Sequence, residues 1–95
     1  MPKVHLDAQV RDDERVKDQQ TANSATRESF FDFIPRIGDH VWFEEQGDFA
    51  IVKNVYYFPD HQNSPRKVPF EIEFYVFRAG LTALIESGHW EASTV

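Results

Sequence analysis

The stretch VPFEIEFYVFR, residues 68–78, alternates its side chains with high regularity, which predicts a β-strand with one buried face and one exposed face. Two further strands are predicted before it, HVWFEE over residues 40–45 and DFAIVKNVYYF over residues 48–58. Only Gln46 and Gly47 separate these two, and a glycine there suits the positive φ of a tight hairpin turn. The three segments therefore predict an antiparallel sheet.

The registers of the two predicted hairpins can be compared with each other. The tight turn places Val41 opposite Val52, and pairing across the loop of residues 59–67 places Val52 opposite Phe74. Both hairpins therefore place the same face of the sheet, the one with Val41, Val52 and Phe74, toward the core. Asn54 falls on that face, which predicts a β-bulge that bends the long second strand and curls the sheet toward a barrel.

This ladder divides the aromatic side chains between two faces. The predicted core-facing set is Phe43, Tyr56, Phe58, Phe70 and Phe74. An aromatic strip remains on the outward face and consists of Trp42, Phe49, Ile51, Tyr75 and Phe77. Its predicted acidic rim consists of Glu44, Glu71 and Glu73. Either the N-terminal arm, residues 30–34 or the C-terminal helix covers this strip, or it is a protein-binding surface or a homodimer interface.

The C-terminal part of the chain carries helix signals. Leu81, Leu84 and Ile85 recur at helical spacing, and Gly88 suits the position just after a helix end, so we expect a helix over about residues 79–87. The tail that follows is either a fourth strand or a coil that lets Trp90 plug one end of the core.

The composition of the chain changes near Glu28, because every Phe, Tyr and Trp follows it. Residues 11–28 have almost nothing to bury, which predicts a linker or a solvated helix. Residues 1–10 alternate with the period of a half-buried strand, and this arm either adds to a sheet edge or is disordered. We therefore expect an arm and linker over 1–28 and a folded domain over 29–95.

A chain of 95 residues allows a single domain. We predict a mainly β fold: a small, bent, antiparallel, barrel-like sheet with a short C-terminal helix and an extended or disordered N-terminal segment. Sixteen Asp and Glu against ten Lys and Arg give a net charge of −6, which repels nucleic acid and argues against direct binding to it. The absence of Cys excludes disulfides, and no apolar run or signal peptide indicates a membrane, so we expect a cytoplasmic protein.

The segment IGDHV, residues 37–41, matches an xxGDxVxA stretch that opens the first strand of Tudor domains, and residues 47–52 loosely match their GxxYxAxV stretch. Residues 34–78 therefore resemble Tudor domains and other small Src-homology-3-like barrels. The resemblance implies a binding module, in Tudor-like members one that holds a cationic side chain in an aromatic cage. Such a cage would use Trp42, Tyr75 and Tyr57.

The residues that could carry catalysis or bind a metal do not form a known motif. The four histidines, at 5, 40, 61 and 89, lack the spacing of a ligand pair, and we expect no metal and no cofactor. Glu71 and Glu73 share a face at a Cα separation of ~7 Å, a spacing that suits paired catalytic carboxylates. Lys53 beside them favours a solvated sheet face instead, so we expect no catalytic residue.

Three functions are compatible with this sequence. The leading one is a non-catalytic protein-binding or assembly module that uses the aromatic strip and its acidic rim. The second is an inhibitor, of the type that phages and plasmids encode, which blocks a host nucleic-acid enzyme through its acidic surface. The third is a small metal-dependent or acid-base enzyme.

Overall fold

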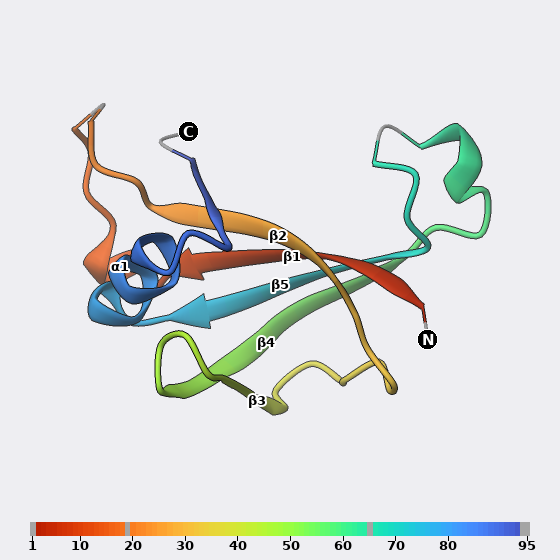
Figure 1. Cartoon of the computed structure of the whole chain (residues 1–95), viewed down its shortest axis with the longest axis horizontal. Helices are drawn as coiled ribbons and strands as arrows, with labels where there is room; N and C mark the ends of the chain where they lie inside the picture. The colour runs from red at the N-terminus through yellow and green to blue at the C-terminus, as the bar shows by residue number, and fades with distance from the viewer. Residues whose placement is uncertain (1, 19, 65, 94–95) are drawn as a thin grey trace.

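The computed structural model describes residues 2–18, 20–64 and 66–93, and within them six strands form one mixed sheet (Figure 1). The strand order is β3-β4-β5-β1-β2-β6. The strands are β1 Lys3–Val10, β2 Ser24–Phe30, β3 His40–Phe43, β4 Asp48–Tyr57, β5 Phe70–Val76 and β6 Glu91–Ser93. The helices are α1 Arg78–Glu86 and the short 3-10 turns η1 Asp12–Glu14 and η2 His61–Asn63. The mainly β prediction is confirmed, as is a C-terminal helix.

The N-terminal segment forms β1, which adds to the β5 edge of the predicted sheet and is itself covered by β2, so it lies inside the six-stranded sheet. β1 pairs in parallel with β5 on one side and antiparallel with β2 on the other. Leu6 lies opposite Ile72 and Ala8 opposite Phe74, and all four side chains are buried. The prediction of a purely antiparallel sheet is therefore wrong, because the alternating apolar residues of β1 fill the core between two strands.

The prediction of a linker over residues 11–28 is wrong from Ser24 onward. β2 begins there and pairs along most of β1, although Ala25 is its one fully buried apolar side chain. The loop before β2 is fixed at Asn23, whose side chain exchanges hydrogen bonds with the backbone of Val16 and accepts one from Arg78. Residues on both sides of position 28 thus belong to one sheet. Pairing with β1 satisfies the backbone of a segment too polar to be recognised as a strand from its sequence.

The predicted β-bulge in β4 is confirmed between Val52 and Asn54. Up to that point the β4–β5 register is the predicted one, with Val52 opposite Phe74. Beyond the bulge the faces of β4 exchange, so Val55 packs toward the core. Tyr56 points outward with 42% of its surface exposed, and its predicted core position is therefore wrong.

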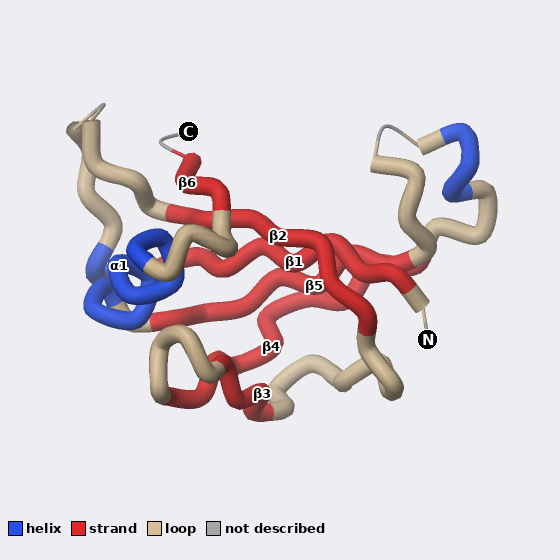
Figure 2. Tube along the Cα trace, viewed as in Figure 1, coloured by secondary structure: helices blue, strands red, loops and turns tan. Residues whose placement is uncertain are grey.

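The β3–β4 hairpin is offset by two residues from the predicted register. Val41 lies opposite Ala50, because the turn spans residues 44–47. An offset of two leaves every side chain on its predicted face. Arg27 of β2 forms an ion pair with Glu45 in this turn, although three strands lie between β2 and β3. The sheet is thus strongly bent, but it is not closed into a barrel (Figure 2).

The core lies on the face of the sheet that α1 covers. Leu81 and Leu84 of α1 are buried there, and Phe31, Ile34 and Ile85 pack against the same cluster. Phe43 makes edge-to-face contacts with Phe74 and with Trp90, at ring centroid distances of 5.1 and 5.3 Å. Trp90 therefore plugs the core, and the tail after it forms the short strand β6. Among the described residues, no helix has the length and apolar character needed to cross a membrane.

The position of β1 in the sheet generates a stability prediction. Leu6→Ala should lower the free energy of unfolding by about 2–5 kcal/mol, because it leaves a cavity between β1, β5 and the core. Urea denaturation measures this loss. The exposed Lys17 serves as the control, and Lys17→Ala should unfold at the wild-type denaturant concentration. Equal midpoints for both variants would contradict a central β1.

Candidate binding surface on the open face of the sheet

The face of the sheet opposite α1 carries no α-helix among the described residues, and we call it the open face. It has an apolar end and a polar middle. The apolar end is built by β3, β4 and the end of β5, and the polar middle by β1, β4 and β5. The outward residues of the apolar end are His40, Trp42, Phe49, Ile51 and Tyr75. Those of the polar middle are His5, Asp7, Gln9, Glu71 and Glu73.

Trp42 and Phe49 form the centre of the apolar end. They lie directly opposite each other on β3 and β4, and their rings pack edge to face at 5.1 Å. Trp42 is 47% exposed, Phe49 51% and Phe77 57%. The elements considered as covers do not hide these rings, because α1, Phe31 and Ile34 pack on the core side.

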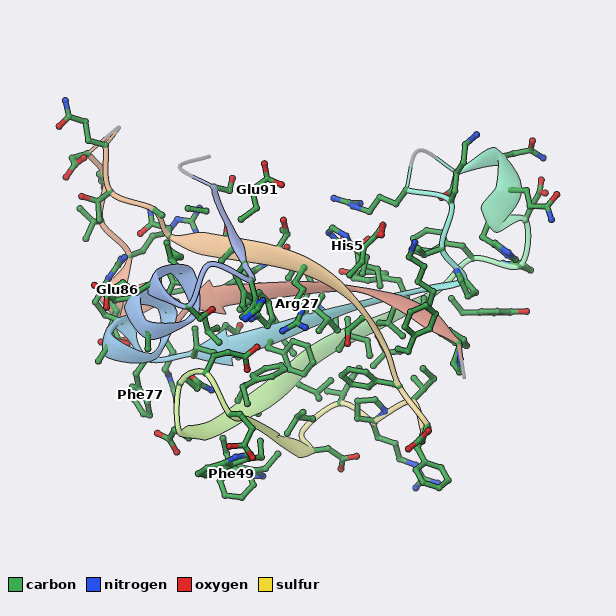
Figure 3. The ribbon with its side chains drawn as sticks, viewed as in Figure 1. His5, Arg27, Phe49, Phe77, Glu86 and Glu91 are labelled. Atoms are coloured by element: carbon green, nitrogen blue, oxygen red, sulfur yellow. The ribbon has the colours of Figure 1, made fainter. Side chains whose placement is uncertain are left out.

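Tyr75 connects the apolar end to the polar middle. It lies opposite Ile51 on β4, and both side chains are half-buried. The Lys53 ammonium lies 5.1 Å from the centre of the Tyr75 ring, in a cation–π contact. Phe77 follows directly after β5 at the start of α1, and Figure 3 places it at the same end of the molecule as Phe49. The strip members thus lie at one end of the sheet.

The three rings expected for an aromatic cage do not lie together. The bulge turns Tyr57 to the other face of β4, where it packs on Phe70 with ring centres 5.1 Å apart. Trp42 and Tyr75 remain on the open face. Two of the three rings expected for a cage therefore remain on this face.

Glu73 is the centre of the polar middle. One carboxylate oxygen accepts hydrogen bonds from Asn54 (2.8 Å) and Tyr56 (3.1 Å), and the other accepts one from Gln9 (3.0 Å). Burial alone would raise the pKa of this carboxyl, but these donors and the Lys53 charge lower it below its ordinary value of 4.5. Glu73 is thus held as a carboxylate by its neighbours, and it ties three strands together. The hydrogen bond that Tyr56 donates to Glu73 also raises the pKa of Tyr56.

The other two rim residues differ from each other. Glu71 lies beside Glu73 on the open face, and its carboxylate forms an ion pair with Arg66 at 3.3 Å. Glu71 is therefore paired with Arg66, whereas Glu73 is bound by Gln9, Asn54 and Tyr56. Glu44 lies in the β3–β4 turn with an exposed side chain. Of the three predicted rim residues, Glu44 is the one whose carboxylate faces solvent.

Two further carboxylates, whose position could not be predicted from the sequence, lie near the strip. Asp12 and Asp13 of η1 are exposed, and together with Arg11 and Tyr75 they line a shallow hollow. The parallel pairing places Gln9 opposite Tyr75, so the residues that follow β1 come to the end of β5. Their position near Tyr75 follows only from the long-range pairing of β1 with β5. Asp48, at the start of β4, is also exposed, but it lies opposite Phe43 and therefore on the core side of the sheet, away from the strip.

The four histidines lie far apart along the fold, on β1, on β3, in η2 and after α1. His40 packs edge to face with Phe49, and His5 is half-buried on β1 with its pKa lowered by burial and by the Arg66 charge. Across residues 2–18, 20–64 and 66–93, no three His, Asp or Glu side chains gather in a geometry that could hold a metal ion.

Comparisons with known proteins leave the family of this chain open. No protein-family model matches the sequence, and no match was found among curated proteins or solved structures. We therefore infer the function from the open face itself.

The network around Glu73 generates a pH prediction. Tyr56→Phe should raise the pKa of Glu73 toward its ordinary value, because the variant loses one donor to the carboxylate. The side-chain carboxyl NMR resonance of Glu73 measures that pKa. Tyr57→Phe is the control, because Tyr57 lies on the other face and should leave the value unchanged.

The lowered pKa also has a consequence for stability. A carboxyl whose pKa is lower in the folded state stabilises the fold above its unfolded pKa and loses that contribution as the pH falls through the folded value. The wild-type protein should therefore lose stability relative to Glu73→Gln as the pH falls below 4.5. If the free energies of unfolding of the wild type and of Glu73→Gln changed with pH in the same way, the stabilising role of the Glu73 carboxylate would be contradicted.

Proposed function

We propose that this protein is a non-catalytic protein-binding module whose contact surface is the aromatic strip with its acidic rim. The observation that carries the proposal is the exposure of Trp42 and Phe49, each about half uncovered, at the apolar end of the open face, with Phe77 57% exposed directly after β5. Burying apolar area on a partner is favourable by about 25 cal/mol per Å². Aromatic residues, Trp above all, supply most of the binding energy at protein interfaces.

The rigidity of the strip supports binding. Trp42 and Phe49 lie on paired strands and hold each other edge to face, so little conformational freedom remains to be lost on binding. Lys53 is fixed over Tyr75 and by its hydrogen bond to Gln9, which keeps the adjoining part of the face in one arrangement. A preformed surface of this kind binds with less entropic cost than a flexible loop.

The charge of the chain favours a different protein as the partner over a second copy. Each copy carries a net charge of −6, so two copies repel each other. The exposed carboxylate of Glu44, in the turn that follows Trp42, adds negative charge beside the strip of each copy. We therefore assign the strip to a heterologous partner.

Mutation of the strip tests the proposal. Trp42→Ala should weaken partner binding by at least about 2 kcal/mol, roughly thirtyfold, because it removes the central ring of the contact. Quantitative affinity purification from the source cells measures the partners retained by each variant. Phe33→Ala is the matched control, because Phe33 is 87% exposed and lies outside the strip.

The result is interpreted together with the solution mass and the folded state of each variant. At least one partner should be lost with Trp42→Ala and retained with Phe33→Ala, while the wild-type protein is a monomer. If both folded variants retain the same proteins as the wild type, the strip is not the contact surface.

A further inference from the structure

β3 is an edge strand of the sheet, and among the described strands it pairs with β4 alone (Figure 2). Edge strands are commonly protected from pairing with other chains by charged side chains, by proline or by a β-bulge. The four residues of β3 include no Lys, Arg, Asp, Glu or Pro, and the pairing of β3 with β4 has no register shift. The free edge of β3 therefore lacks these protective features.

The backbone groups of β3 alternate between β4 and the free edge. The Asp39 carbonyl, directly before the strand, accepts a hydrogen bond from an N–H of β4 at 2.9 Å. The Phe43 carbonyl, at the end of the strand, accepts one at 3.0 Å from an N–H in the turn that leads to β4. Neighbouring residues of an antiparallel strand direct their backbone groups to opposite sides. The N–H and C=O groups of His40 and Trp42 therefore point away from β4.

These outward groups define what can bind at the edge. Among the described residues, no backbone hydrogen bond outside the sheet ladder uses the N–H or C=O of His40 or Trp42, and both residues are exposed. Two residues that each present a donor and an acceptor, about 7 Å apart, match the spacing of a second extended chain. A helix satisfies its own backbone groups internally and cannot pair in this way. The edge therefore selects an extended segment.

Trp42 belongs both to this edge and to the aromatic strip. Its backbone faces the free edge, whereas its ring lies on the open face and packs on Phe49 at 5.1 Å. A residue paired with Trp42 in an added strand would direct its side chain to the same face, with its Cα about 5.5 Å from that of Trp42. That side chain would cover part of the Trp42 surface, which is 47% exposed. One extended segment thus satisfies the backbone groups and buries the central ring.

We propose that the partner of the aromatic strip contributes an extended segment, which pairs as an additional strand with the free edge of β3 and places a large apolar side chain beside Trp42. This inference rests on the proposed function and adds the mode of recognition. The segment belongs to a different protein, because two copies of a chain with a net charge of −6 repel each other. The four residues of β3 limit the pairing to a short segment.

Selected peptides test this mode without knowledge of the natural partner. The intact wild-type protein selects binders from a phage-displayed library of random peptides, with Trp42→Ala as the counter-selection and Phe33→Ala as the control that retains them. Each selected peptide is synthesised with one N-methylated residue at a time. Methylation at alternate residues should weaken binding by about fivefold or more, because every second N–H of an added strand faces β3. Methylation at the intervening residues should leave the affinity unchanged.

Amide hydrogen exchange then locates the peptide on the protein. In the protein alone, the amides of His40 and Trp42 should exchange quickly, whereas the amide of Val41 should be protected by the pairing of Val41 with Ala50. A saturating concentration of a selected peptide should slow exchange at His40 and Trp42. The exposed Lys17 should exchange at the same rate with and without the peptide.

The outcomes separate the two proposals. Peptides that depend on Trp42 but tolerate N-methylation at every position, or that leave exchange at His40 and Trp42 unchanged, would overturn strand addition and leave the strip as a binding surface. Slower exchange of these two amides as the concentration of the protein alone is raised would place a second copy at the edge and overturn the assignment to a partner segment. A library that yields no peptide dependent on Trp42 would overturn the proposed function and the inference with it.

Discussion

The parallel pairing of β1 with β5 is the interaction on which the rest of the structure depends. It places Leu6 and Ala8 in the core against Ile72 and Phe74, and it gives β2 a strand to pair with. It also builds the open face, because Gln9 comes to lie beside Tyr75 and its side chain reaches Glu73. Both faces of the sheet are therefore organised by the first ten residues.

The bulge in β4 is the second constraint, and it decides which side chains the open face contains. The residue inserted between Val52 and Asn54 exchanges the faces of the strand beyond it. Asn54 and Tyr56 then reach Glu73, and Tyr57 is turned away from the aromatic strip. An unbulged strand would have placed Tyr56 in the core and left Glu73 with fewer donors.

Much of the C-terminal two thirds of the fold could be predicted from the sequence. Alternation specified β3, β4 and β5, and both the bulge at Asn54 and the outward direction of Trp42 and Phe49 followed from the ladder. These features depend on neighbouring strands joined by turns, where register and face are coupled to the hydrophobic pattern. The offset of the β3–β4 hairpin escaped prediction, because Gln46 and Gly47 suit a tighter turn than the one that forms.

The centre of the sheet could not be predicted, for a physical reason. Gln9 and Glu73 are 64 positions apart, and no short turn joins the two parallel strands, so their pairing could not be predicted from a turn. The β2 segment is polar because one face of it is exposed and its core side carries Arg27 and one buried alanine. Asp12 and Asp13 reach the hollow beside Tyr75 only through this pairing, so their position could not be predicted either.

The central claim is that β1 is a fully paired strand in the middle of the sheet, and amide hydrogen exchange tests it most directly. The amides of Leu6 through Val10 should exchange as slowly as those of β5, because β1 has a hydrogen-bonded neighbour on each side. The exposed loop residues Lys17 and Asp18 should exchange quickly in the same sample. Rapid exchange along β1, together with protection of β4 and β5, would contradict the account.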